Sequence, residues 1–151
     1  MMNKMIAAIV IVYVGLTSGT ATAQAMDPNL KGLPPALQKA IAAETHGATI
    51  KSVSKEKEHG KVIYEVETLV NGRTRDVNFD ANGAVLVVEE QSSLEAIPPA
   101  ARAAIEQRAT GGRLKTVELV TKNGKTTYEA IIVKGGKNIE VVVNSDGSAA
   151  K

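Results

Sequence analysis

The chain of 151 residues contains no cysteine and no tryptophan, and its only aromatic residues are three tyrosines and one phenylalanine. The absence of cysteine excludes disulfides and thiolate metal sites, so core packing alone must hold the fold together. The scarcity of aromatic side chains argues against single-stranded nucleic acid as a ligand, because binding of that kind depends on base stacking.

The chain also lacks a strong charge of either sign, since 18 basic and 16 acidic residues give a formal net charge of +2. It has no dense stripe of Lys and Arg of the kind that binds a phosphate backbone. Its only histidines, His46 and His59, are too few for a zinc site or a hydrolytic triad in one cluster. We therefore expect no catalytic residues, no cofactor, no metal site and no nucleic-acid partner.

Long hydrophobic runs are missing as well. The apolar run Ile6–Leu16 is shorter than the roughly 20 residues that span a bilayer. It follows Lys4 and precedes small and polar residues, which is the layout of a secretory signal peptide over residues 1–25. Cleavage after Ala23 and cleavage after Ala25 both fit. The sequence thus predicts a periplasmic or secreted protein with no stable membrane insertion after signal cleavage.

What the chain does contain is a duplication. Leu33–Val87 recurs as Ile97–Lys151 at a constant offset of 64 residues and without a gap. The positions shared by both copies include, in the first copy, Pro34, Pro35, Ala36, Ala40, Ile41, Gly47, Lys51, Val53, Gly60, Lys61, Tyr64, Glu65, Gly72, Val77 and Gly83. We expect one repeat over 30–92 and a second, truncated repeat over 93–151. A unit of this size is marginal for an independent core, so the two copies should pack on one another.

Each repeat is expected to begin with a short helix, over 34–46 and 98–110, because a Pro-Pro pair opens an apolar stripe of helical spacing. Alternating apolar residues between Gly-containing turns then predict strands. These strands cover 49–56, 61–70, 73–80 and 84–90 in the first copy, and 113–121, 125–134 and 137–144 in the second. The predicted fold class is α+β: two tandem repeats, each a short helix packed on one face of an antiparallel β-meander, with the second repeat lacking the last strand.

The period of two along 61–70 predicts which side chains share a face. Val62, Tyr64 and Val66 should lie beneath the helix. The opposite face should be open, and in the second copy it is more apolar than solvent exposure explains. The predicted partner-binding residues on this face are Glu65, Glu67, Leu69, Glu129, Ile131, Val133 and Val142. A simpler interpretation makes Tyr64 and Tyr128 core anchors and pairs Glu65 and Glu129 with a lysine on a neighbouring strand.

One segment resembles a calcium-binding loop in its spacing, but we interpret it as a turn. Asn78–Gly83 followed by Glu89 approximates the spacing of an EF-hand loop. Its first position is Asn, the residues after Gly83 alternate like a strand, and no helices flank it. We expect a hairpin here.

The order of motifs also resembles a known family. It consists of a short helix ending in Gly, a strand, Gly-Lys-x-x-Tyr-Glu-Val at 60–66, an Asn-Gly turn, and Val-x-Phe-Asp-x-x-Gly-x-Val-Leu at 77–86. This resembles the PepSY and PepSY-like, or beta-lactamase-inhibitor-like, exported bacterial domains. The tandem arrangement is similar to inhibitors whose two repeats present a concave sheet surface to an enzyme.

The resemblance implies an exported, non-enzymatic module that binds or inhibits another envelope or secreted protein through an open sheet face. A hydrolase is one candidate partner. An alternative is an envelope sensor or carrier that holds a small ligand or a metal between two sheets. Self-association through the edge of the second copy is a further option.

Overall fold

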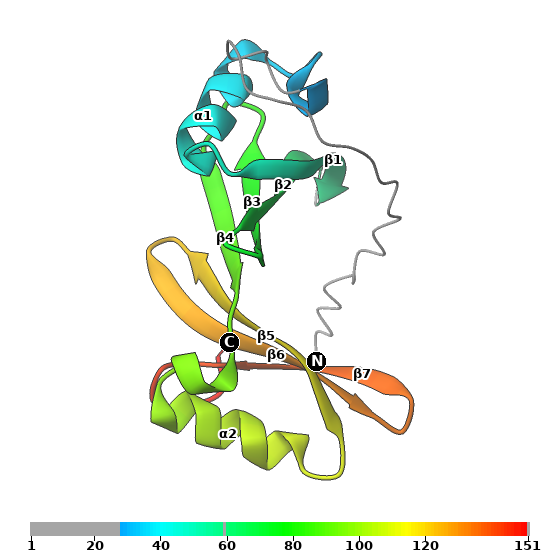
Figure 1. Cartoon of the computed structure of the whole chain (residues 1–151), viewed down its shortest axis with the longest axis vertical. Helices are drawn as coiled ribbons and strands as arrows, with labels where there is room; N and C mark the ends of the chain where they lie inside the picture. Colours follow the sequence, from blue (N-terminus) through cyan, green and yellow to red (C-terminus); the bar gives the residue numbers. More distant parts are fainter. Residues whose placement is uncertain (1–27, 59, 151) are drawn as a thin grey trace.

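A computed structural model describes residues 28–58 and 60–150, so the predicted signal peptide lies outside the described residues. The described chain folds into two α-helices and one antiparallel sheet of seven strands, each lying beside its neighbour in sequence (Figure 1). The helical elements are η1 (Pro28–Leu30), α1 (Pro35–Thr45), η2 (Leu94–Ala96) and α2 (Pro99–Ala109). The strands are β1 (Thr49–Glu58), β2 (Lys61–Val70), β3 (Arg73–Asp80), β4 (Val85–Gln91), β5 (Arg113–Lys122), β6 (Lys125–Lys134) and β7 (Lys137–Val143). No helix in these ranges is long and apolar enough to cross a membrane.

The predicted α+β class is confirmed, since helix and strands follow one another twice and the second repeat ends in fewer strands. Even irregularities recur. β1 is bulged between Ile50 and Ser52, and β5 is bulged between Leu114 and Thr116. The residue inside each bulge is a lysine, Lys51 or Lys115, at the same position of the repeat.

The repeats are joined edge to edge, which differs from the expected packing of one copy on the other. β4 pairs with β5 from Val87 opposite Lys122 to Gln91 opposite Glu118, so seven strands form one sheet. This pairing satisfies backbone groups that an unpaired edge of β4 would leave open. Since the described residues form a single sheet, they contain no space between two sheets for the ligand of the alternative hypothesis.

The second repeat makes only the start of a fourth strand. Val143 bridges Ala149, and the N–H of Ala150 donates to the carbonyl of Val142. The equivalent pair in the first repeat is Phe79 opposite Val85, where β4 begins. The bridge therefore keeps the register of the repeat.

Both helices cover the same face of the sheet. The first core joins α1 to β2 and β3, and the second joins α2 to β6 and β7. Their buried side chains are Leu30, Leu37, Ile41, Tyr64, Val66, Val77 and Phe79, and Ile97, Ala101, Ile105, Val117, Ala130, Ile132, Val141 and Val143. The register shows that the two cores lie on the same side of the sheet. Val77 of the first core lies opposite Val88, and Val88 lies opposite Thr121 on β5, so these residues share one side. The other side carries no helix within the described ranges, and we call it the open face.

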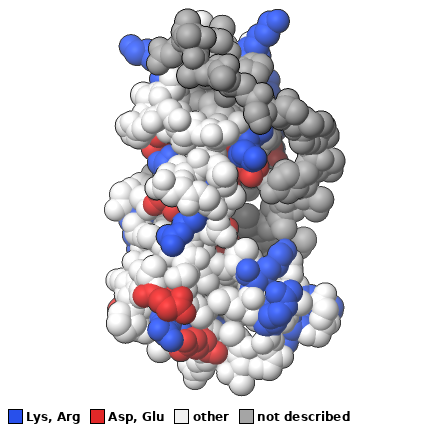
Figure 2. Space-filling view, viewed as in Figure 1, with Lys and Arg blue, Asp and Glu red and all other residues white. Residues whose placement is uncertain are grey.

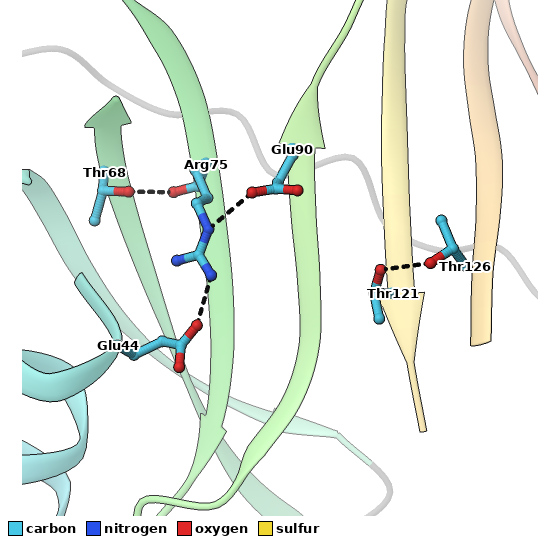
Figure 3. A network of polar contacts seen from close by, with 6 residues as sticks. All are labelled: Glu44, Thr68, Arg75, Glu90, Thr121 and Thr126. Atoms are coloured by element: carbon cyan, nitrogen blue, oxygen red, sulfur yellow. Dashed lines mark hydrogen bonds and ion pairs between the residues drawn. The ribbon is translucent and has the colours of Figure 1, made fainter. Parts of the chain in front are cut away.

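A charged network ties the first helix to its strands on the helix-covered side. Arg75 on β3 contacts Glu44 at the end of α1 at 2.5 Å and Glu90 on β4 at 3.1 Å (Figure 3). Its carbonyl oxygen accepts a hydrogen bond from the hydroxyl of Thr68 at 2.7 Å. Arg75 thus connects three elements of the first repeat.

Candidate functional site

The predicted site residues all lie on the open face. Tyr64 and Val66 are buried beneath α1, so the alternating residues of β2 point to the opposite side. The same alternation places the predicted residues of β6 and β7 on the open face. These residues are Glu65, Glu67, Leu69, Glu129, Ile131, Val133 and Val142. Leu69 is 37% exposed, Glu67 is only 5% exposed, and the other five are half-buried.

The register adds carboxylates that the sequence reading did not include. Glu67 lies opposite Asp76, and Asp76 lies opposite Glu89, so three acidic residues stand in a row across β2, β3 and β4. On β5 and β6, Glu118 lies opposite Glu129. Directly opposed side chains in a sheet have Cβ atoms roughly 4.5 to 5.5 Å apart, so these carboxylates are neighbours.

Apart from Asp80, whose carboxylate binds the backbone of the following turn, we call the acidic side chains that share the open face across strands β2 to β7 the carboxylate cluster. Its members are Glu65, Glu67, Asp76, Glu89, Glu118, Glu129 and Glu140. Four of them, Asp76, Glu89, Glu118 and Glu140, were missed. The alternation rule, applied to β3, β4, β5 and β7 as it was to β2, would have placed them on this face.

The register places no lysine directly opposite either of the repeated glutamates. Glu65 stands between Ser54 and Asn78 in the register. Glu129 stands between Glu118 and Val142. The cross-strand neighbour of Glu129 therefore has the same charge, which is destabilising where both side chains are ionised.

Burial and mutual repulsion raise the pKa values of the cluster. Burial raises the pKa of Asp76 to about 7, and the charges of Glu65, Glu67, Glu89 and Glu118 add to the effect. Burial and the neighbouring glutamates likewise raise the pKa values of Glu89 and Glu129 to about 7. Burial also raises the pKa of Glu118.

Basic residues stand at the margin of the open face. Apart from the two bulge lysines, the basic residues that share its alternation are the first or last residues of their strands: Lys61, Arg113, Lys122 and Lys125. The centre of the face is therefore acidic. Around α2, by contrast, Figure 2 shows basic and acidic groups next to one another.

Asp80 and His46 have structural roles. The carboxylate of Asp80 accepts hydrogen bonds from the backbone N–H groups of Asn82 and Ala84, which closes the predicted hairpin and lowers the pKa of Asp80. His46 ends α1 in a left-handed conformation with φ of 47°, and His59 lies outside the described residues. Within residues 28–58 and 60–150, no group of three His, Cys, Asp or Glu could hold a metal ion.

Tyr64 is a core residue, as the simpler interpretation predicts. It is 6% exposed, and the ammonium of Lys55 lies 5.7 Å from its ring centroid. This contact is within the range of a cation–π interaction.

Comparison with known families bears out the resemblance for the first repeat. The PepSY family, described as the peptidase propeptide and YPEB domain, matches residues 32–86. The first repeat is PepSY-like. No curated protein matches the chain.

Solved structures of similar fold cover both repeats. A BLIP-like protein from Bacteroides fragilis is 24% identical, with 83% of this chain and 89% of that chain covered and a TM-score of 0.60. A DUF2874 family protein from Bacteroides ovatus is 16% identical, with 80% and 86% covered and a TM-score of 0.65. A candidate periplasmic protein from Bacteroides eggerthii is 14% identical, with 79% and 86% covered and a TM-score of 0.66. At these identities the similarity shows that the PepSY-like repeat and its truncated copy share the fold of these proteins.

Proposed function

We propose that the protein is an exported, non-enzymatic binding module that binds or inhibits another envelope or secreted protein through its open face. The observation that carries this proposal is the composition of that face. Apolar residues such as Ile131, Val133 and Val142 lie beside desolvated carboxylates, and no helix within the described residues covers them. A mixed apolar and charged surface of this kind is typical of a protein interface.

The comparisons support the same function. The PepSY description names peptidase propeptides, and one protein of similar fold is BLIP-like. By analogy, the partner of this protein is a hydrolase of the envelope. The periplasmic description of a third protein of similar fold, together with the predicted signal peptide, supports export. The boundaries proposed for the module are 30–92 and 93–151.

Substitution of Ile131 by Lys tests the function. The side chain is half-buried on β6 opposite Glu140, which can accept the introduced ammonium. We expect Ile131→Lys to abolish capture of the partner from a periplasmic extract while the thermal transition stays almost unchanged. Val133→Lys should behave in the same way.

Ile139 supplies a matched control. It lies on β7, is 44% exposed and belongs to the helix-covered side, because its register partner Ile132 is buried in the second core. Ile139→Lys should leave capture intact. Equal loss of capture in Ile139→Lys and Ile131→Lys would refute the assignment to the open face, and collapse of the fold in Ile131→Lys would make that residue part of the core. Equilibrium dialysis with calcium and zinc tests the carrier alternative, which requires retention of one of the ions at micromolar concentration.

A further inference from the structure

The open face combines mutually repelling carboxylates with buried oxygens that lack hydrogen-bond partners. Buried oxygens with no hydrogen-bond partner among the described residues are Ser54 Oγ, Asp76 Oδ1, Asn78 Oδ1 and Asn144 Oδ1. The first three belong to the open face and are close in register. Ser54 and Asn78 flank Glu65 on either side, and Asp76 is two residues from Asn78 along β3.

The chemistry of these oxygens defines what is missing. Asp76 Oδ1 and Asn78 Oδ1 are acceptors, and the hydroxyl of Ser54 can also accept. Leaving a buried acceptor unpaired is costly, so such groups in a folded protein call for an explanation. The missing groups are therefore hydrogen-bond donors.

The charges point in the same direction. Glu67, Asp76 and Glu89 stand in one row, and, apart from the two bulge lysines, the basic residues of the face are confined to strand ends. A ligand that brings positive charge would turn the repulsion within this row into attraction. A group that supplies both donors and positive charge is a guanidinium, which presents five N–H donors in a plane and pairs with carboxylates in a bidentate manner.

We propose that the carboxylate cluster, together with Ser54 and Asn78, binds an arginine-bearing basic segment of the partner protein. This inference rests on the proposed function and names the chemistry of the partner. Apolar side chains lie in the same part of the face, because Val87 stands opposite Asn78 and Val120 stands opposite Glu89. They favour a polypeptide, which offers apolar contacts beside its charges, over a small free polyamine.

The test is a titration of the purified, isotopically labelled protein with a hexa-arginine peptide, followed by NMR at pH 7.5 and low salt. We expect shifts at the side-chain amide of Asn78 and at the backbone amides around Asp76 and Glu89. The double variant Glu89→Gln, Glu118→Gln should weaken binding by about tenfold or more, because two desolvated charge contacts are lost. Both substitutions keep the shape of the side chain.

The single variant Glu89→Gln should also weaken binding, and Glu106→Gln is its matched control, because each removes one negative charge. Glu106 is an exposed residue of α2 whose carboxylate pairs with Arg102 at 2.8 Å. If binding depends only on overall charge, Glu106→Gln will weaken it as much as Glu89→Gln does, and the proposal is then overturned. Absence of shifts at Asn78 overturns it too, as does tighter binding of hexa-lysine or spermine than of hexa-arginine.

The outcome is separable from that of the proposed function. If hexa-arginine does not bind but Ile131→Lys still abolishes partner capture, the proposal of a basic segment is refuted and the proposed binding function stands. If Ile131→Lys retains capture, the assignment of the binding surface to the open face is refuted.

Discussion

Several residues that the two repeats share are explained by one close contact. Gly83, in the turn before β4, has φ of +87°, and a Cβ atom there would lie 2.7 Å from Cβ of Ala40 and 3.0 Å from the carbonyl oxygen of Ala36. Gly147 repeats this geometry against Ala100 and Ala104. The helix can approach the hairpin only because all of these residues are small. Their identity in both copies therefore follows from packing, and no role in binding is needed to explain it.

This contact predicts a large effect of Gly83→Ala on stability. An alanine at position 83 would have to keep an unfavourable left-handed backbone conformation, and its methyl group would overlap with α1. Together these effects should lower the free energy of unfolding by about 2–4 kcal/mol. Gly72→Ala is the control, because Gly72 has φ of +80° but a Cβ atom there would meet nothing within 4 Å. It should lose only about 1–2 kcal/mol from the backbone term. Urea denaturation measures both, and equal losses would mean that the close approach has no energetic weight.

At the scale of the elements, the first repeat has a connection that the second lacks. Arg75 joins α1 to β3 and β4, whereas the equivalent position on β7 is Ile139. The side chain of Arg75 is 18% exposed, so its two ion pairs are better shielded from water than the helix pair of Arg102 with Glu106. Shielding strengthens such contacts.

We therefore expect Arg75→Met to lower the free energy of unfolding by about 1–2 kcal/mol, since two charge-assisted contacts disappear while the apolar stem remains. Arg102→Met removes an exposed pair four residues apart on α2 and should cost no more than about 0.5 kcal/mol. Chemical denaturation of both variants gives the comparison. A smaller loss for Arg75→Met than for Arg102→Met would contradict the structural role of the network.

Local sequence signals predicted the elements and their antiparallel pairing within each repeat, but not the pairing between the repeats. The bounds of β2, β3 and β6 agree with the predicted 61–70, 73–80 and 125–134, because Gly-containing turns mark their ends. The pairing of β4 with β5 was not foreseen, since alternation reports which face a residue takes and not which strand lies beside it. The site shows the same limit. The open face was predicted from β2 and β6, but Glu118 opposite Glu129 emerges only from the register.

At the scale of the whole molecule, the carboxylate cluster couples stability to pH. Asp76, Glu89 and Glu129 have folded pKa values of about 7, above reference values of 3.8 for Asp and 4.5 for Glu. Between these limits the folded state binds more protons than the unfolded state, so stability falls as pH rises from about 4.5 to about 7. The groups that face Asp76 are Glu65 and Glu67 on β2, Glu89 on β4 and Glu118 on β5. All are acidic, so none of them counteracts the trend.

Acid exposure has the opposite effect through three other residues. Hydrogen bonds lower the pKa values of Asp80, Glu95 and Asp146 in the folded state, so their contribution to stability is lost as pH falls through these lowered values. Stability should therefore reach its maximum near pH 4, between the two trends. Between pH 5 and pH 7.5 we expect a loss of roughly 1–2 kcal/mol, because partial exposure screens the repulsion within the cluster.

Thermal melts from pH 4 to pH 8 test this coupling, and one substitution localises it. Glu89→Gln removes the carboxylate that stands opposite Asp76, so it should raise the melting temperature at pH 7.5 and change it little at pH 5. Glu106→Gln, on α2 and outside the cluster, should leave the shape of the pH profile unchanged. A melting temperature that rises steadily from pH 5 to pH 7.5 would mean that the opposed carboxylates are compensated in solution. The open face would then have no excess negative charge with which to attract a basic partner.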